Sequence, residues 1–307
     1  SGDALATVKL FKLLLQKDSQ KEIIKRSVRS NPKNNLDTKL IQIIDELPSS
    51  TGVYYMHNKA GDVIYIGKSK NIKKRINQHF TNNNHKSKKI QKEVFTVTYE
   101  NTGNELLALL KENEEIKKNK PVYNRALKKD IFNYALYRSK DKDGYIQFRI
   151  GKASPDKENI TTFTNISQAK STMERIVTEF ELCQKHTGLH KTSSSCFNFS
   201  IKECYGACVG EESAEAYNER AQKVINKYSY ENKNMLVIDR GRDVDEKSVI
   251  LIEDGKFCGM GYFNLNFQMN NIDMVKNIIT PMKNNRDSQH IIQSYLRKNK
   301  PYKIVEF

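Results

Sequence analysis

The hydrophobic and polar positions of this chain follow two periodicities, that of strands and that of helices, which together predict a mixed α/β (α+β) fold. In the first part, β-branched and aromatic runs predict strands, and apolar residues at helical spacing predict helices around them. The predicted elements are a short helix at 40–47, strands at 52–56 and 62–67, a helix at 71–80, a strand at 93–100 and a helix at 105–118. After the short helix, the ββαβα order describes a small α/β unit.

The rest of the chain carries a looser pattern that becomes strand-rich toward its end. The predicted elements are strands at 132–140 and 145–152, helices at 167–180 and 214–228, strands at 235–241, 248–255 and 257–264, and a helical tail at 288–298. We therefore expect the chain to be divided into several parts. These parts are a helix at 1–16, a linker at 17–37, the ββαβα domain at 38–130, a cysteine-containing helical region at 131–230, and a C-terminal α/β region without an assigned role at 231–307.

The first sixteen residues place leucine and valine side chains on one face of a predicted helix. The run SGDALATVKLF resembles the end of a DnaQ-like exonuclease of the DNA polymerase III epsilon type. That resemblance makes Asp3 the metal-binding aspartate of the last exonuclease motif, and it implies a fusion of which this chain is the C-terminal part. An ordinary helix with Asp3 near its N-cap is the alternative. In both cases this sequence holds no complete exonuclease site.

Positive charge is concentrated in the ββαβα region. The chain of 307 residues has a net charge of +16, and residues 51–130 hold 17 Lys and Arg against 8 Asp and Glu, which gives +9. Such a local cationic field attracts polyphosphates and releases their counterions, so we expect a nucleic-acid partner. No apolar run is long enough to span a membrane and no signal-peptide pattern is present, so we expect a cytoplasmic protein.

Two short triplets lie on the first two predicted strands, GVY at 52–54 and YIG at 65–67, with ten residues between their tyrosines. The triplets alone are common strand fragments. Polar residues directly after the second triplet, on the predicted helices and in the run KPVYN make the pattern specific for one kind of site. These residues are Lys68, Arg75, Glu112 and Asn124.

The segments GVY, YIGKSKNIKKR and ALLKENEEIKKNKPVYN resemble the GIY-YIG nuclease domain of UvrC-type excision-repair proteins and of their shorter relative Cho. The resemblance implies that Tyr65 is the general base, and nearby positive charge, for example on Lys68, would help this phenol to act at neutral pH. Arg75 has the planar fork that matches a phosphate. Tyr54 would orient water or Tyr65, and Asn124 would hold the site together. An ordinary structural role is the alternative for each of these residues.

Glu112 is the candidate ligand for Mg²⁺ (or Mn²⁺), because a hard cation takes carboxylate oxygens. Leu109 lies three residues before it and Ile116 four after it, so this acid interrupts an apolar helical face. Glu114 and Glu115 instead have polar neighbours one turn further on. A metal at Glu112 would serve phosphodiester hydrolysis, which needs an activated water and neutralisation of charge.

One position departs from the UvrC pattern. Where that family commonly shows Tyr before Phe at the end of the first helix, this chain has His79 before Phe80. His79 lies four residues after Arg75 and therefore shares its helical face. It replaces the tyrosine as a phosphate contact or proton carrier, or it is simply solvated.

Four of the five cysteines crowd into residues 183–208, at intervals of 13, 8 and 4. Clustered thiols favour a metal site, and soft thiolates suit both iron–sulfur clusters and Zn²⁺. The run CFNFSIKECYGACVG, followed by EAYNERAQKVI, resembles the same UvrC/Cho family, whose members hold a 4Fe-4S cluster on four such cysteines. The four candidate ligands are Cys183, Cys196, Cys204 and Cys208.

Two other arrangements of these cysteines stay open. His186 lies three residues after Cys183, so the two residues could belong to a mixed zinc ligand set, and His190 follows four residues later. Reduced, partly buried cysteines without a metal are the other possibility. Cys258 lies on a predicted strand and is expected to be a core thiol.

The leading hypothesis is a metal-dependent endonuclease that makes a single incision in damaged DNA during nucleotide excision repair, by resemblance on the 3′ side of the lesion. The sequence shows no RNase H-like carboxylate set and no helix-hairpin-helix repeat, which favours one cut over two. UvrB is the partner that the resemblance implies. The alternative is a nucleic-acid-binding module that serves an attached exonuclease and does not cut. An RNA- or junction-directed GIY-YIG enzyme is a third hypothesis.

Overall fold

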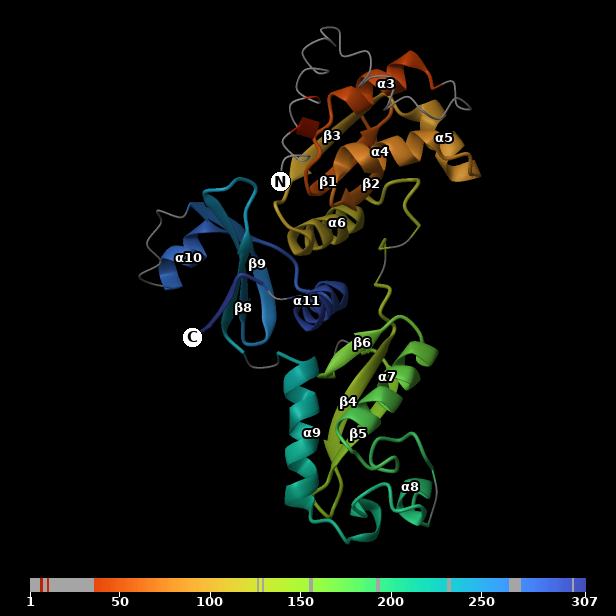
Figure 1. The fold of residues 1–307 in the computed structure, drawn as a ribbon, viewed down its shortest axis with the longest axis vertical. Helices are drawn as coiled ribbons and strands as arrows, with labels where there is room; N and C mark the ends of the chain where they lie inside the picture. Colours follow the sequence, from red (N-terminus) through yellow and green to blue (C-terminus); the bar gives the residue numbers. More distant parts are fainter. Residues whose placement is uncertain are drawn as a thin grey trace.

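The structure is a computed structural model of the chain, and it describes most residues after position 35 (Figure 1). The described residues are 6, 7, 10, 36–125, 127, 128, 130–154, 157–191, 194–230, 233–264, 272–299 and 301–307. Asp3 and nearly all of the predicted helix at 1–16 and linker at 17–37 lie outside the described residues. None of the described helices is long and apolar enough to cross a membrane.

The N-terminal part is a three-stranded antiparallel sheet in the order β2-β1-β3, with helices on both faces. Its elements are α3 (Thr38–Asp45), β1 (Gly52–His57), β2 (Val63–Ser69), α4 (Ile72–Thr81), α5 (His85–Glu93), β3 (Thr96–Asn101) and α6 (Glu105–Asn119). The predicted α/β unit is confirmed, and the structure adds helix α5. The pattern did not indicate α5 because its sequence, HKSKKIQKE, is almost wholly polar and Ile90 is its only buried apolar residue.

The two faces of this sheet belong to different cores, because successive strand residues point to opposite sides. Tyr54 and Met56 face α4 and α5, and Val53 lies on the opposite face, toward α6. On the first face, the buried helix residues are Ile72, Ile76, Phe80 and Ile90. On the second face, the buried residues are Val53, Ile66, Ala108 and Ile116.

The middle part contains a small antiparallel sheet in the order β5-β4-β6, whose first two strands match the strands predicted at 132–140 and 145–152. Its elements are β4 (Tyr134–Lys140), β5 (Ile146–Lys152), β6 (Thr161–Phe163), α7 (Ile166–Glu179), α8 (Phe197–Ser200), the 3₁₀ turn η1 (Ala207–Val209) and α9 (Ala214–Tyr228). The cysteine segment lies between α7 and α9. One hydrophobic core joins the sheet, both long helices and the buried Cys183 and Cys196.

The C-terminal part is a five-stranded antiparallel sheet in the order β10-β9-β8-β7-β11. Its elements are β7 (Met235–Arg240), β8 (Glu246–Glu253), β9 (Lys256–Asn264), α10 (Ile272–Ile278), β10 (Ile279–Pro281), α11 (Arg286–Lys298) and β11 (Lys303–Glu306). The three long strands and α11 match the sequence prediction. The short α10, β10 and β11 were not predicted, because a few residues carry too little periodicity.

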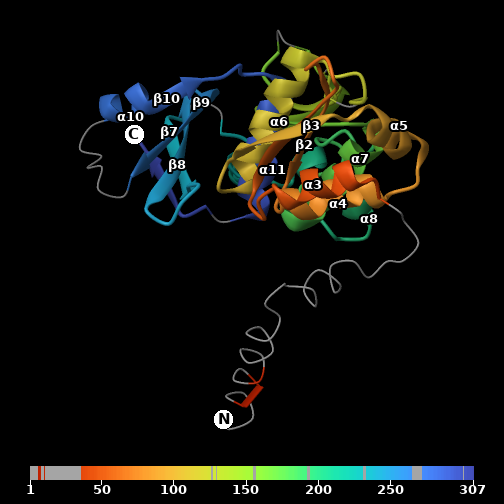
Figure 2. The same ribbon diagram turned by 90° about the horizontal axis from the view of Figure 1, so that it is seen from above.

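Helix α6 lies at the border between the first sheet and the C-terminal sheet, next to α11 (Figures 1 and 2). Leu106, Leu107 and Leu110 of α6 share a core with Met235 of β7 and Ile292 of α11. The first domain, predicted to end at 130, therefore shares one of its helices with the region predicted to begin at 231. A burial of this kind stabilises the border by roughly 2 kcal/mol for each leucine.

The loop before α6 also fits closely against the C-terminal sheet. The Asn104 side chain donates hydrogen bonds to the Arg240 carbonyl and to the Ser248 hydroxyl, both at 2.8 Å. Gly103 has a φ of +75°, and a Cβ atom there would lie 1.9 Å from the Gly241 carbonyl oxygen. A side chain at position 103 would therefore separate the two parts.

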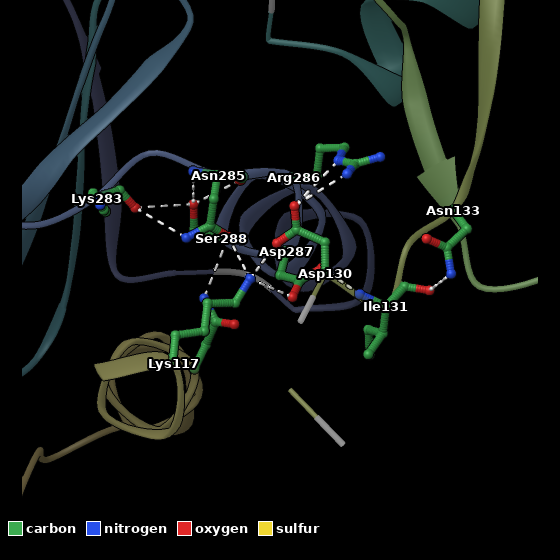
Figure 3. Close-up of polar contacts among 10 residues, drawn as sticks. Lys117, Asp130, Ile131, Asn133, Lys283, Asn285, Arg286, Asp287 and Ser288 are labelled. Atoms are coloured by element: carbon green, nitrogen blue, oxygen red, sulfur yellow. Dashed lines mark hydrogen bonds and ion pairs between the residues drawn. The ribbon is translucent and has the colours of Figure 1, made fainter. Parts of the chain in front are cut away.

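A network of four charged residues ties α6 to α11 and to the segment that leads into the middle part (Figure 3). The Lys117 ammonium lies 2.7 Å from Oδ2 of Asp287, a carboxylate with 0% exposed side-chain surface. Lys117 also pairs with Asp130, and Asp130 pairs with Arg286 at 3.2 Å. The Ile131 amide donates to Oδ1 of Asp287 at 3.2 Å, which anchors the connecting segment at the same point.

Replacing the central cation tests how far this network holds the parts together. In Lys117→Met, the Asp287 carboxylate would stay buried without its cation, so we expect the free energy of unfolding to fall by about 3–5 kcal/mol. Urea denaturation measures this change. Lys118→Met, on the exposed side of the same helix, is the control and should change stability by less than about 0.5 kcal/mol. Equal stability of the two variants would contradict the role of Lys117.

Candidate active site

The two triplets lie side by side on β1 and β2, and their glycines are required by close contacts. Tyr54 pairs with Gly67 across the strands, and the Tyr54 hydroxyl lies over the Gly67 backbone, where a Cβ atom would be only 2.3 Å away. A Cβ atom at Gly52 would lie 2.1 Å from the Glu100 carbonyl oxygen of β3. Each triplet therefore begins or ends at a position where a side chain does not fit.

Tyr54, Tyr65 and His79 form one aromatic group on the α4 side of the sheet. The Tyr54 hydroxyl lies 2.9 Å from Nε2 of His79, and Tyr54 is 1% exposed. The Tyr65 ring centroid lies 6.2 Å from that of Tyr54 and 5.1 Å from that of His79. Burial, with smaller effects of the Arg75 and Lys86 charges, lowers the pKa of His79 to about 4, so this imidazole is neutral at pH 7. His79 is thus a partner of Tyr54 and is not a simply solvated residue.

Tyr65 is a protonated phenol in this arrangement. Burial raises its pKa, and the nearby Glu112 carboxylate raises it further. The Arg75 charge and a hydrogen bond with Tyr54 act in the opposite direction. Tyr65 therefore needs additional positive charge before it can accept a proton at neutral pH.

Glu112 lies on α6 in a row of residues that faces the sheet, between the buried Ala108 and Ile116. Its Oε1 accepts a hydrogen bond of 3.1 Å from the Lys68 amide at the end of β2. Burial raises the pKa of Glu112 to about 7, against the opposing effects of Lys68 and Arg75. Among the described residues, Glu112 forms no ion pair with a lysine or arginine. This half-buried carboxylate, which has no ion-pair partner in the described part of the chain, fits a divalent cation.

The structure changes the part expected of Lys68. Its ammonium lies 2.6 Å from Glu105, which also pairs with Lys70 at 2.8 Å, so its charge is already engaged. The cation next to Tyr65 is Lys86, whose Nζ lies 4.4 Å from the centre of the Tyr65 ring. The sequence did not point to Lys86, because it lies on α5, the helix that the hydrophobic pattern did not predict.

Arg75 and His79 lie on the same face of α4, as their spacing predicts. Together with Tyr65 and Lys86 they border a cavity of about 500 Å³. Arg75 donates a hydrogen bond of 3.3 Å to Gln78 and forms no ion pair within the described residues. Its guanidinium therefore keeps donors for an anionic ligand in the cavity.

Asn124 holds the edge strand of the sheet. Its side chain accepts a hydrogen bond from the Ile66 amide at 2.9 Å and donates one to the Ile66 carbonyl at 2.8 Å. The Tyr123 amide continues this pairing by donating to the Ile64 carbonyl at 3.0 Å. Asn124 thus fixes β2 between the two site residues Tyr65 and Lys68, and its position favours the structural role over direct chemistry.

The four clustered cysteines converge on Cys196 in the middle part. The Sγ atoms of Cys183, Cys196 and Cys208 all lie within 4.8 Å of one another. Sγ of Cys196 lies 3.7 Å from that of Cys208 and 3.9 Å from that of Cys204. Thiolates about 2.3 Å from one tetrahedral metal ion are separated by similar distances. Burial raises the pKa of the Cys183 thiol to about 12, so a cation is needed to keep this buried sulfur as a thiolate.

His186 does not join this group, which corrects the mixed zinc set considered for Cys183 and His186. The His186 ring stacks on Tyr145 with centroids 4.9 Å apart. Its Nε2 lies 3.4 Å from the Ala207 carbonyl and its Nδ1 lies 3.5 Å from the Asp141 carboxylate. Within the described part of the chain, the metal-ligand cluster contains cysteines alone, and His190 is outside it as well.

Two protein families match the chain at the places where these sites lie. The UvrC-like GIY-YIG domain matches residues 50–125, and the middle domain of the UvrC/Cho excinucleases matches residues 132–227. The first match contains the tyrosine, arginine and glutamate group, and the second contains all four clustered cysteines. The N-terminal fold and its site thus define a GIY-YIG endonuclease domain.

Two similar proteins from different organisms have the same name. UvrABC system protein C of Francisella tularensis subsp. holarctica is 32% identical over 191 residues, which cover 61% of this chain and 31% of the relative. The protein of the same name from Methanococcus maripaludis is 31% identical over 208 residues, or 67% of this chain and 38% of the relative. The chain thus spans about a third of the length of these curated relatives.

A solved structure is also similar in sequence. It is the GIY-YIG N-terminal endonuclease domain of UvrC from Thermotoga maritima bound to magnesium, with 33% identity over 29% of this chain and 98% of that one, at a TM-score of 0.27. On the two family matches, this chain belongs to the UvrC/Cho excision-repair family of GIY-YIG endonucleases. The attached DnaQ-like exonuclease stays a prediction.

A methyl group at position 67 tests the packing of Tyr54. In Gly67→Ala the new Cβ would meet the Tyr54 hydroxyl, which cannot move freely because Tyr54 is buried. We expect a loss of about 1–3 kcal/mol in the free energy of unfolding, measured by chemical denaturation. Gly151→Ala, in a strand of the middle part where the nearest atom is 3.4 Å away, should have little effect. Comparable losses in both variants would argue against a special constraint at Gly67.

Proposed function

We propose that this chain is a Mg²⁺- or Mn²⁺-dependent DNA endonuclease that makes one incision, on the 3′ side of a lesion, in nucleotide excision repair. The observation that carries the proposal is the convergence of Tyr65, Arg75 and the uncompensated Glu112 around the end of β2. Three different elements bring these residues together, and their charges influence one another. A chance grouping of surface residues would not leave a buried carboxylate without a cation.

Each residue then has a chemical task. Arg75 binds a non-bridging oxygen of the scissile phosphate with its planar fork. Tyr65 accepts a proton from the attacking water, and Tyr54 orients Tyr65 while its own hydroxyl is held by neutral His79. Glu112 would hold the metal, which when bound neutralises charge on the phosphate and favours the deprotonated phenol. Asn124 keeps β2 in place during the reaction.

The charge distribution supports a nucleic-acid substrate, and the family resemblance supports damaged duplex DNA. Residues 51–130 carry +9, from 17 Lys and Arg against 8 Asp and Glu, and phosphates are the natural partners of this excess. Family membership supports a UvrB-like helicase as the protein that delivers the DNA. We propose a cytoplasmic location for this activity.

Removing the proposed base or metal ligand tests the mechanism. Tyr65→Phe and Glu112→Ala should each lower the rate of nicking of a supercoiled, lesion-carrying plasmid by about 10²-fold or more, because proton transfer or metal binding is lost. DNA binding, measured by a gel shift, should stay within a few fold. Tyr99→Phe on β3 and Glu115→Ala on α6 are matched controls and should nick at the wild-type rate.

The outcomes separate the two candidate functions. Unchanged nicking by both site variants would end the proposed mechanism. Tight DNA binding by the wild-type chain without nicking, with either metal and with a UvrB-like protein present, would favour the non-cutting module. RNA or branched DNA cut in preference to the plasmid would redirect the proposal to another substrate.

We also propose that the four clustered cysteines hold a resident metal group, either Zn²⁺ or a 4Fe-4S cluster. The Sγ distances among Cys183, Cys196 and Cys208 suit a single tetrahedral ion. Cys204 lies 3.9 Å from Cys196 but outside that group of three, so it would have to move to become the fourth ligand. A four-iron cluster would require the thiolates to move apart. Family resemblance supports the cluster. Because both groups would be bound by all four thiolates between α7 and α9, either would stabilise this segment.

Elemental analysis identifies the metal group. Protein purified without oxygen should contain either one zinc ion or iron with inorganic sulfide, and only the iron–sulfur form should be brown. Cys196→Ser, at the centre of the group, should lose the metal and melt at a lower temperature, whereas Cys258→Ser on β9 should keep it. A wild-type protein without metal, and with stability equal to that of Cys196→Ser, would contradict this site.

A further inference from the structure

The cavity beside Tyr65 is bordered by cations that lack a carboxylate partner within the described part of the chain. Neither Arg75 nor Lys86 forms an ion pair there, whereas Lys68 and Lys70 share Glu105. Burial lowers the pKa of Lys86, and the charges of Arg125 and Arg75 lower it further. Like charges held together in this way repel one another, so the fold maintains them at a cost in stability.

Lys86 is held firmly in the first turn of α5. The Asn84 side chain caps the helix by accepting a hydrogen bond of 2.7 Å from the Ser87 amide. Ile90, one turn after Lys86, is fully buried. The Gln91 side chain donates 3.0 Å hydrogen bonds to the His79 carbonyl of α4 and to the Asn82 carbonyl. These contacts fix α5 against α4, and they place the Lys86 ammonium 4.4 Å from the centre of the Tyr65 ring.

We propose that Lys86 is a positioning residue for Tyr65, whose ring it fixes and whose phenolate form it stabilises. This inference rests on the proposed function of Tyr65 as the general base. A cation over an aromatic face is attracted to the ring, and the attraction grows when the ring carries the delocalised negative charge of a phenolate. Lys86 thus supplies the positive charge that Lys68, paired with Glu105, does not supply.

The other groups that face Tyr65 do not make this contribution redundant. Arg75 of α4 favours the phenolate, but Glu112 of α6 opposes it. The neighbouring Tyr54 is itself a buried phenol, and burial raises its pKa, so it remains uncharged. His79 is neutral as well because its pKa is lowered to about 4. Within the described part of the chain, Arg75 is thus a cation that favours the phenolate, and Lys86 is a cation that lies over the Tyr65 ring.

The test compares Lys86→Met and Lys86→Arg with the matched control Lys88→Met, which removes the same charge from another exposed position of α5. Single-turnover nicking of the lesion-carrying plasmid is followed across pH at several enzyme concentrations. Lys86→Met should lower the maximal nicking rate by about tenfold near neutral pH, because less Tyr65 phenolate is present. For the same reason, the ascending limb of the plot of rate against pH should move about one pH unit toward alkaline pH. Lys86→Arg should restore most of the rate, and Lys88→Met should match the wild type.

A second measurement needs neither nicking nor metal. Tyrosinate absorbance is titrated in the wild type and in Lys86→Met, each against the same protein with Tyr65→Phe, so that the difference reports Tyr65. We expect Tyr65 to titrate at higher pH without Lys86, in protein whose circular dichroism is unchanged. An unchanged Tyr65 titration in Lys86→Met would overturn the inference.

The kinetic outcomes also separate this inference from the proposed function. If Lys86→Met raises only the half-saturating enzyme concentration and keeps the wild-type maximal rate and pH profile, Lys86 merely binds DNA and the inference is wrong. If the wild type does not nick at all, the proposed function fails, and the Tyr65 titration still decides the role of Lys86.

Discussion

The packing of α6 between two sheets is the constraint on which the rest of this structure depends. One side of the helix carries Ala108, Glu112 and Ile116 against β1 and β2, while the leucines on its other side lie in the core of the C-terminal sheet. A rotation or shift of the helix would move Glu112 relative to the Lys68 amide. The C-terminal sheet, which had no assigned role, therefore acts as the support for the carboxylate at the other side of the same helix.

The electrostatics of the site follow from burial more than from individual ion pairs. Burial raises the pKa of both Glu112 and Tyr65 and lowers that of His79, so each group is less charged than it would be in water. At the same time Arg75 and Lys86 keep their positive charge close by. Without ligands, the Glu112 carboxylate lacks a cation within the described residues, and the Arg75 and Lys86 side chains lack an anion there. A divalent cation and a phosphate would supply these partners.

Sequence patterns predicted the parts of the fold with strong periodicity and missed those that depend on tertiary contacts. The strands around Tyr54 and Tyr65 were found because their alternation is long and regular, whereas α5 was missed because Ile90 is its only buried apolar residue. Lys68 was expected near Tyr65 because it follows closely in sequence. Residues three apart in a strand point to opposite faces, however, and Lys68 pairs with Glu105 instead.

The cysteine site illustrates the same limit. Clustering predicted that the thiols would meet, but His186 is excluded by its stacking on Tyr145 and by the polar partners of both its ring nitrogens. Ring stacking between residues so far apart in sequence leaves no signal in spacing.

The cations of the first domain also determine how DNA binding responds to salt. Lys68 and Lys70 share the single carboxylate of Glu105, which offsets part of their charge before DNA arrives. Arg75 and Lys86 have no such partner among the described residues, and they release counterions condensed on the DNA when they meet a phosphate. Rising ionic strength would therefore weaken the contacts of Arg75 and Lys86 with a phosphate more than those of the lysines that share Glu105.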